Sequence, residues 1–229
     1  MESLVRKHFR ERAEKGEYIS KKAEILPTRH DKGRLLEVGC GGSLSYSPTE
    51  LEVYGIDIVP KMAHVFRIKH PDGNIVVCDV KRLPFRDNTF DIIVSTWLLH
   101  HLVGCTPRKC VNNICVALRE VKRVLDDGGD FLLREHLLRN RLASFVLFYT
   151  TFLCAKLHIN IDFLDIHSQV VTYFLTEKEL GRLCDKTGFG AKELSCKKWR
   201  FRKVDLGKYD AEFLLHAHQR LRPGSLWSV

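Results

Sequence analysis

The sequence predicts an α/β domain with a mostly parallel sheet covered by helices. From Gly33 onward, short segments that are apolar at consecutive positions alternate with polar helical segments, as expected for strands buried on both faces. The first such segment runs into Gly39, Gly41 and Gly42, which let a backbone pass close to a ligand. The next strand ends in Asp57. The order strand, glycine turn, strand, acid indicates a nucleotide-binding domain more specifically than a lone glycine pair does.

Size and charge set the limits of the interpretation. With 229 residues, 45% of them hydrophobic, the chain is long enough for one sizeable domain with a small appendage. A formal charge of +9 predicts a surface that attracts anions, which include nucleic acid, acidic lipid headgroups and phosphorylated substrates. Because the basic residues are spread along the chain, we expect most of them to be solvated surface.

Cysteine usage predicts a cytoplasmic protein with reduced thiols. The eight cysteines fall mainly in apolar segments, and no charged-then-apolar signal sequence opens the chain. Cys105, Cys110 and Cys115 recur every five residues, a spacing that does not gather them on one helix face. A zinc site with His100 and His101 is conceivable, but there is no Cys-x-x-Cys pair, so we predict no metal.

The expected elements follow in chain order. Residues 1–32 should form a helical cap, either amphipathic and packed over the domain through Phe9 and Ala13 or simply solvated. A helix over Pro107–Leu125 should end in a glycine C-cap at Asp127-Gly128-Gly129, and a later helix should begin after Thr176 and run to Thr187-Gly188. Strands are expected at Arg34–Val38, Val53–Ile56, Ile75–Cys78, Phe90–Ser95 and Asp130–Glu135.

Further motifs narrow the ligand. The third strand ends in Asp79-Val80, an acid beside an apolar residue that suits the amine and face of a purine. Leu83-Pro84-Phe85 and the strand containing Asp91 follow. In this order the chain resembles the class I S-adenosylmethionine-dependent methyltransferases, in particular the small-molecule branch that includes quinone-biosynthesis enzymes. The resemblance covers roughly Gly33 to Leu194.

The resemblance implies a fold and a set of cofactor contacts. The fold would be a Rossmann-like, doubly wound, mostly parallel seven-stranded sheet over 33–209, with a helical acceptor-side insertion at 140–174 after the fifth strand and a tail at 210–229. Asp57 would hold the ribose hydroxyls of S-adenosyl-L-methionine. The other implied contacts are Glu37, Gly39 and Gly41 at the methionine end, Ile58, Asp79 and Val80 at the adenine, and Ser95 and Trp97 near the sulfonium.

Two features depart from the family pattern. Ser43 stands where a third glycine is usual, and the interval from Glu37 to Asp57 is short and contains Pro48. We therefore expect the first crossover helix to be truncated or to start late. Either cofactor affinity would then be lower than usual or the methionine end would be held differently, and a noncatalytic cofactor-binding regulator or assembly partner stays open as an alternative.

Three histidines are candidate general bases, which methyl transfer needs only if the acceptor is protonated near neutral pH. They are His100 and His101, at the exit of the fourth strand, and His167. Lining of the pocket or a structural role is equally compatible with the His100-His101 pair.

Three segments outside these motifs have more than one interpretation. Leu142–Ala155 is apolar and too short to cross a bilayer as an ordinary helix; it is a lid over the acceptor pocket, a buried core helix or an interfacial membrane helix. Lys197–Lys203 mixes bases with aromatics, which favours an edge strand over nucleic-acid stacking. The tail from Asp210 predicts a terminal helix and a loose end.

These observations favour a methyltransferase that acts on a small, partly apolar acceptor. RNA, especially tRNA, is the alternative acceptor because of the positive charge, and peripheral membrane contact is a further expected interaction. A hydride-transfer dehydrogenase shares the glycine turn and the ribose acid but does not account for Asp79, Leu83-Pro84-Phe85 and Asp91.

Overall fold

The computed structural model describes residues 2–15, 32–46, 50–161, 170–198 and 208–217. Its centre is a seven-stranded sheet in the order β3-β2-β1-β4-β5-β7-β6. Every neighbouring pair is parallel except those made by β7, which is antiparallel to β5 and β6. The predicted α/β class and mostly parallel sheet are thus confirmed. The strands are β1 (Lys32–Val38), β2 (Glu50–Asp57), β3 (Asn74–Val77), β4 (Phe90–Thr96), β5 (Leu125–Leu138), β6 (Phe189–Lys198) and β7 (Lys208–Ala217).

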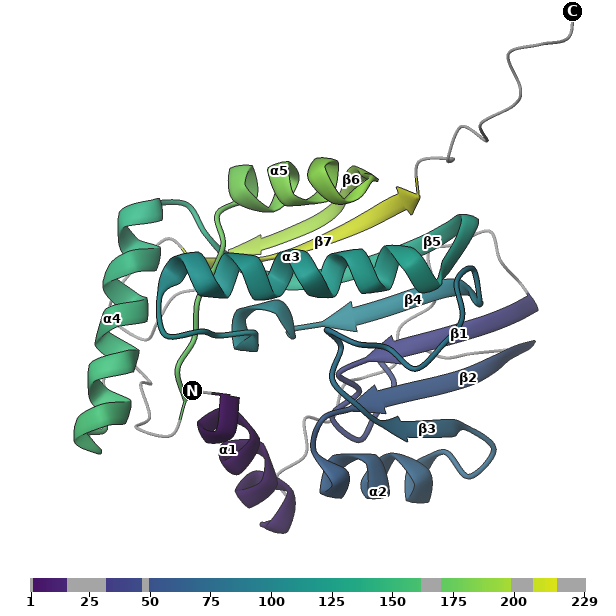
Figure 1. The fold of residues 1–229 in the computed structure, drawn as a ribbon, viewed down its shortest axis with the longest axis horizontal. Coiled ribbons are helices and arrows are strands. Elements are labelled where there is room, and N and C mark those ends of the chain that lie inside the picture. The colour runs from purple at the N-terminus through teal and green to yellow at the C-terminus, as the bar shows by residue number, and fades with distance from the viewer. Residues whose placement is uncertain (1, 16–31, 47–49, 162–169, 199–207, 218–229) are drawn as a thin grey trace, which may run out of the picture.

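Helices cover the two faces of this sheet (Figure 1). Successive strand residues point to opposite faces, so Leu36 joins the core beneath α3 (Pro107–Val124) and α5 (Glu177–Thr187), whereas Leu35 faces Phe66 of α2 (Pro60–Lys69). All three side chains are buried. The fully apolar strands in the sequence are explained by this burial on both faces.

The N-terminal helix α1 (Glu2–Glu14) packs onto the domain, as the amphipathic interpretation expects. Ala13 is buried against Val59 and Met62, and Phe9 packs on the same cluster. Phe9 also meets the ring of His101 edge-on, with centroids 4.9 Å apart. Helix α1 therefore lies beside the ends of β2 and β4, at the edge of the sheet to which the parallel strands point (Figure 1).

The two helix ends predicted around glycines have different outcomes. Helix α5 has the expected cap, in which the Thr176 and Glu179 side chains each accept from the other's backbone N–H, and Gly188 follows with φ 85°. The glycine C-cap predicted for α3 is wrong. That helix ends at Val124 with Leu125 already extended, and Gly128-Gly129 lie within β5, where the register with β4 shifts.

The predicted terminal helix in the tail is also wrong, because residues 208–217 form β7 between β5 and β6. Alternation of buried Ala211, Phe213 and Leu215 with less buried neighbours is a strand pattern. Strand β6 is at the sheet edge, so Lys197 and Lys198 belong to an edge strand as favoured from sequence, and the remainder of the Lys197–Lys203 run lies outside the described residues.

Helix α4 (Arg141–Leu157) forms the insertion after β5 and stands across one end of the sheet (Figure 1). Asn140 caps it by accepting from the Leu142 N–H at 2.8 Å. Its inner face, which includes Leu147 and Cys154, packs on Leu138 and Phe174. No helix in the described part of the chain combines the length and the hydropathy that spanning a bilayer needs.

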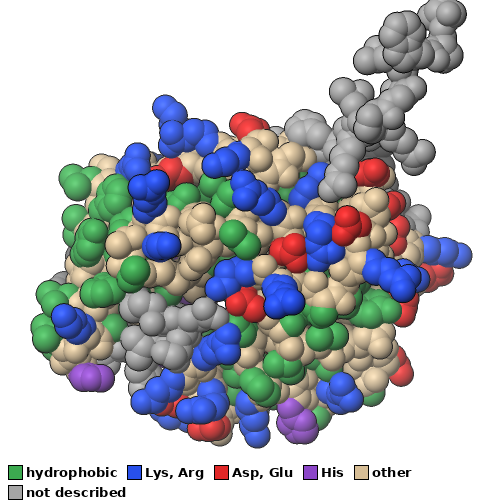
Figure 2. Space-filling view, viewed as in Figure 1, with side chains coloured by type: hydrophobic (Ala, Val, Ile, Leu, Met, Phe, Trp, Pro, Cys, Tyr) green, Lys and Arg blue, Asp and Glu red, His purple; other side chains and the backbone are tan. Residues whose placement is uncertain are grey.

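Basic side chains are distributed over the face drawn in Figure 2, with acidic ones interspersed on its right-hand part. This distribution agrees with a largely solvated set of bases. Several are paired at the sheet margin, for example Lys32 with Glu50 at 3.3 Å and Arg34 with Glu52 at 3.3 Å.

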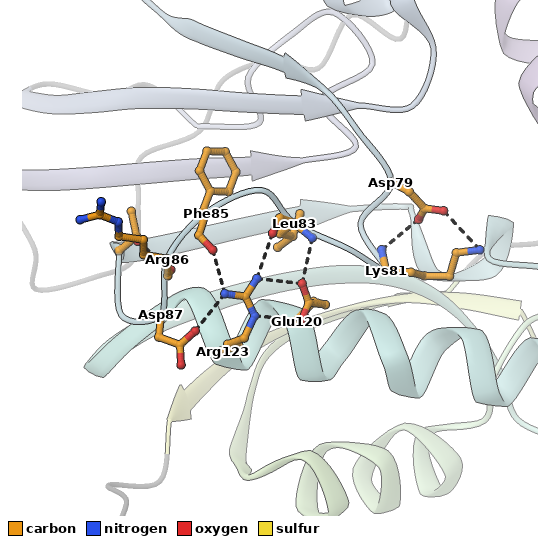
Figure 3. A network of polar contacts seen from close by, with 9 residues as sticks. Asp79, Lys81, Leu83, Phe85, Arg86, Asp87, Glu120 and Arg123 are labelled. Atoms are coloured by element: carbon orange, nitrogen blue, oxygen red, sulfur yellow. Dashed lines mark hydrogen bonds and ion pairs between the residues drawn. The ribbon is translucent and has the colours of Figure 1, made fainter.

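One arginine fixes the connection between β3 and β4. The Arg123 guanidinium on α3 donates to the carbonyls of Leu83 and Phe85 and to the carboxylates of Glu120 and Asp87, at 2.7–2.9 Å (Figure 3). Glu120 in turn accepts from the Leu83 N–H. These charge-assisted bonds replace the regular secondary structure that the segment lacks, so they hold the loop that follows Asp79.

Candidate functional site

The glycine turn after β1 leaves open space at one position. Gly39, Gly41 and Gly42 all have positive φ, a conformation that favours glycine. A Cβ at Gly39 would come within 2.8 Å of Leu98, and one at Gly42 within 2.8 Å of Val65. At Gly41 the nearest atom would be the Gly39 carbonyl oxygen at 4.0 Å. A ligand can therefore approach the backbone at Gly41.

The expected truncated or late crossover helix is absent from the described part of this connection. After the turn, which the Ser43 N–H closes by donating to the Cys40 carbonyl at 3.0 Å, residues 43–46 are buried and non-helical. Only residues 39–49 separate β1 from β2, which is at the lower limit for a crossover that includes a helix. Leu44 and Tyr46 fill the position against the sheet instead.

Asp57, at the tip of β2, is oriented by two backbone donors. Its Oδ2 accepts from the Gly41 N–H at 2.9 Å and its Oδ1 accepts from the Val59 N–H at 2.8 Å. A carboxylate offers about four acceptor sites, so two N–H donors do not use all that this group type provides. The carboxylate thereby links the glycine turn to the end of β2 in a fixed orientation.

Asp79 lies at the neighbouring strand tip. The Cys78 N–H donates to the Asp57 carbonyl at 3.1 Å, which keeps the ends of β2 and β3 together. Asp79 Oδ1 accepts from the Lys81 N–H at 2.9 Å, and its other oxygen is 3.3 Å from Lys81 Nζ (Figure 3). Val80 beside it is buried. The structure thus brings the Asp57 and Asp79 segments to adjacent positions.

Glu37 is a fully buried carboxylate at the end of β1. It accepts from the Ser45 hydroxyl at 2.6 Å and from the Ser45 N–H at 3.3 Å, and Ser45 Oγ is 2.8 Å from Thr96 Oγ1 on β4. This chain of contacts ties the segment after the glycine turn to the tips of β1 and β4.

The end of β4 carries unsatisfied groups and backbone strain. Among the described residues, Ser95 Oγ, Trp97 Nε1 and His101 Nδ1 are buried polar atoms with no hydrogen-bond partner in the protein. Trp97 also has φ 55°, which costs a bulky residue free energy. Buried polar atoms are normally paired, so these atoms indicate a ligand position beside β4.

A buried carboxylate that the sequence analysis did not identify lies at the next strand. Glu135 on β5 is 1% exposed and accepts from the backbone N–H groups of Leu99 at 2.6 Å and His136 at 2.8 Å. Glu135 Oε1 also hydrogen-bonds to His100 Nδ1, at 2.5 Å. Burial raises the pKa of Glu135 to about 7 despite the opposing effect of these neighbours, and burial lowers the pKa of His100 well below its ordinary value.

His136, also missed from sequence, forms a second acid–histidine pair. Its Nδ1 meets Asp210 Oδ1 on β7, directly across the antiparallel pairing. The His136 ring stacks on Trp97 with centroids 5.3 Å apart, and Phe174 stacks on His100 at 5.1 Å. Polar residues at the end of an otherwise apolar strand were the available signal, but the partner Asp210 lay in the segment interpreted as a helix.

Of the two other candidate histidines, His101 lies beside His100, with ring centroids 4.0 Å apart. His101 follows His100 in the 3-10 turn η1 (Leu99–His101) and is covered by Phe9 of α1. Burial, followed by the charges of His100 and His8, lowers the pKa of His101 well below its ordinary value. His167 lies outside the described residues.

Along the edge of the sheet these groups form one ordered row. Following the strand order β3-β2-β1-β4-β5, the row runs from Asp79 through Asp57 and Gly41 to Trp97 and finally His136. Carboxylates and open glycine backbone occupy one end, and stacked aromatic rings occupy the other. No group of three metal-ligating side chains occurs in the described ranges. The unsatisfied atoms at β4 and the space at Gly41 fit an elongated organic ligand.

Comparison with known proteins agrees with this geometry. Residues 36–133 match a family described as a methyltransferase domain. Curated relatives include an uncharacterized methyltransferase, YcgJ, of Bacillus subtilis, 30% identical over 45% of this chain and 40% of that protein. A probable tRNA methyltransferase 9B of Bos taurus is 29% identical over 48% and 23%, and a demethylmenaquinone methyltransferase of Renibacterium salmoninarum is 30% identical over 44% and 40%. The matched segment spans less than half the length of these relatives.

The fold has solved counterparts. A crystal structure from Methanosarcina mazei described as an S-adenosylmethionine-dependent methyltransferase superposes with a TM-score of 0.61 at 18% identity, covering 86% of this chain and all of that one. This likeness establishes the architecture, whereas the assignment of the domain rests on the sequence match.

The pair Glu135–His100 generates a prediction about stability and pH. The pKa of Glu135 is about 7 in the folded chain and about 4.5 in the unfolded chain. Between pH 4.5 and pH 7, folding is therefore coupled to the uptake of a proton. The difference in the free energy of unfolding between the wild type and Glu135→Gln should therefore be largest below pH 4.5. It should fall by about 1.4 kcal/mol per pH unit as the pH rises from 4.5 to 7.

Urea unfolding of both proteins at a series of pH values measures this difference directly. Asp72→Asn, which removes an exposed carboxyl, is the matched control. A wild type minus Glu135→Gln difference that stays constant from pH 4.5 to 7 would contradict the prediction.

Proposed function

We propose that the chain is a class I S-adenosylmethionine-dependent methyltransferase that transfers a methyl group to a small, partly apolar acceptor. When bound, S-adenosyl-L-methionine supplies an electrophilic methyl group on its sulfonium. The observation that carries the proposal is the ordered row at the sheet edge, in which polar groups lead to unsatisfied atoms at β4 and then to an aromatic wall. The chain's own tasks are to orient the two reactants and to exclude water.

The cofactor would be held at the polar end of the row. Asp57, already oriented by two N–H donors, would accept from the ribose hydroxyls. Asp79 would accept from the adenine amine, with Ile58 and Val80 as apolar neighbours of the base. Gly39, Gly41 and Glu37 would line the methionine end, with Ser95 and Trp97 near the sulfonium; the unpartnered Ser95 Oγ and Trp97 Nε1 support a ligand there.

The acceptor would lie over the ends of β4 and β5. Trp97, His100, His136 and Phe174 present stacked rings at this place, and α4 packs behind Phe174. Such a wall favours a flat or partly apolar molecule over a strongly hydrated one. The match to a demethylmenaquinone methyltransferase is consistent with an acceptor of this kind.

His136 is the residue that we assign as general base, if the acceptor must lose a proton. Its Nδ1 meets Asp210 Oδ1, the arrangement in which a carboxylate orients a histidine that acts as a base. His100 and His101 are assigned to the pocket wall, because burial keeps both uncharged and His100 Nδ1 is already engaged by Glu135.

Methylation of tRNA is the second candidate function. It is favoured by the positive net charge and by the relatives described as probable tRNA methyltransferases. Phosphate contacts would make RNA binding fall steeply with salt, which binding of a small neutral acceptor would not do.

The cofactor assignment predicts a loss of affinity in Asp57→Ala. We expect S-adenosyl-L-methionine to bind about 10–100-fold more weakly, because charge-assisted hydrogen bonds to the ribose are removed. Isothermal titration calorimetry measures this. Asp72→Ala is the control for loss of an exposed carboxyl, and Asp57→Asn tests the site if the alanine variant loses its fold. Unchanged affinity in both Asp57 variants would refute the assignment.

The base assignment predicts a loss of turnover in His136→Phe, which keeps a ring to stack on Trp97. We expect kcat to fall about 100-fold or more with cofactor affinity unchanged, since general base catalysis contributes that much. Asp210→Asn should act in the same direction. His64→Phe, at an exposed histidine of α2, is the matched control, and unchanged kcat in His136→Phe would exclude the role.

Incubation with methyl-labelled cofactor and fractionated cell extract tests the acceptor class. We expect label in the organic-soluble small-molecule fraction. Label in RNA would favour the tRNA function, and tight cofactor binding with no labelled product in any fraction would favour a noncatalytic regulator.

A further inference from the structure

Helix α4 has a second apolar face that nothing in the described structure covers. In the described ranges, most of the large hydrophobic side chains that are exposed lie on α4 or just after it, at Ile159. The others are Ile68 and Val77. Those on α4 are between 54% and 67% exposed. They are Leu142, Val146, Tyr149, Leu153 and Leu157.

These side chains form a continuous stripe. Their spacings of four, three, four and four residues keep them on one side of a helix, opposite the inner face that packs on Leu138 and Phe174. At 1.5 Å per residue the stripe is roughly 22 Å long. Figure 2 shows hydrophobic side chains along the left margin of the molecule, over the position of α4 in Figure 1.

A basic hollow adjoins the beginning of the stripe. Its volume is about 710 Å³, and its lining carries four cationic side chains against the single carboxylate of Glu177. Leu138 and Thr176 complete it, and the cations are Arg139, Arg141, Lys178 and Arg182. At the other end, Lys156 is exposed. The apolar stripe is therefore flanked at both ends by groups that attract anions.

We propose that the α4 stripe and this basic hollow dock the chain on the surface of an anionic lipid bilayer. The stripe would lie in the plane of the interface with its apolar side chains at the acyl boundary, and the arginines and lysines would meet lipid phosphates. Tyr149, at the centre of the stripe, has the amphipathic ring that suits the headgroup level.

Charge favours this occupant over a second copy of the chain. If two copies paired through their stripes, in either orientation, the basic flanks of one helix would approach basic flanks of the other, which is unfavourable. An anionic lipid surface complements them. The proposal concerns a surface outside the reactive site and stands whether the acceptor is a small molecule or RNA.

Co-sedimentation of the full chain with vesicles tests the proposal. We expect binding at low salt to phosphatidylcholine vesicles that contain phosphatidylglycerol, and weak binding to phosphatidylcholine alone. The double variant Val146→Glu and Leu153→Glu should bind anionic vesicles at least tenfold more weakly. Ile68→Glu, an equally exposed apolar side chain on α2, is the matched control and should bind like the wild type.

A second pair of variants tests the basic hollow. The double variant Arg139→Gln with Arg182→Gln should bind anionic vesicles more weakly than the wild type, and its binding should depend less on salt concentration. Arg67→Gln on α2 should bind like the wild type. Inorganic phosphate at matched ionic strength should not displace the protein from vesicles, and complete displacement would identify a free-anion site that overturns the lipid assignment.

Two other outcomes would overturn the proposal. One is no binding of the wild type to anionic vesicles at low salt, or equal binding by the double variant. The other is a wild-type dimer by light scattering that the double variant converts to a monomer, without vesicle binding. Cofactor titration of each variant reports whether it is folded, and Val146→Gln with Leu153→Gln supplies a milder change if the glutamates disrupt the helix.

Discussion

The buried carboxylate of Glu135 joins the tips of β4 and β5, and the cluster of aromatic rings at the end of these strands depends on it. One oxygen accepts from the Leu99 N–H in the turn after β4, and the other meets His100 and the His136 N–H. A desolvated carboxylate is costly unless it is fully hydrogen-bonded, so these partners cannot move independently. The positions of His100, of the strained Trp97 and of the Trp97–His136 stack are consequences of this constraint.

At the opposite end of the row, Asp57 has the corresponding structural role. The described part of the connection after β1 contains no helix, and the turn is stabilised by a side chain, because the Gly41 N–H donates to Asp57. The same carboxylate that orders the turn is the one expected to meet the ribose. The carboxylate that orders the turn is thus also part of the polar edge at which we propose that the cofactor binds.

Helix α4 connects the site to the outside of the molecule. Its inner face holds Phe174, which stacks on His100, so the helix supports the aromatic wall of the acceptor side. Its outer face is apolar but has no intramolecular partner in the described chain. The lid and core-helix interpretations concern the inner face, which packs on Leu138 and Phe174. The interfacial interpretation concerns the exposed outer face. An apolar helix inserted at the sheet edge can serve these roles together because its two faces are independent.

The sequence by itself determined the α/β class, the glycine turn, the strand-end acids and the cap of α5, since each depends on local conformation or on a short-range pattern. Gly39 and Gly41 have the positive φ that their residue type allows, and Thr176 caps a helix whose first turn supplies its partner. The positions of Asp57 and Asp79 at one edge followed from strand order, because parallel strands bring their ends to one edge, whereas the role of Trp97 was implied by the family resemblance. Tertiary structure alone decided that 208–217 is a strand, which places Asp210 beside His136 across 74 residues, and that Glu135 is desolvated. Those contacts join segments far apart in the chain, and their energies depend on burial, which no local sequence pattern specifies.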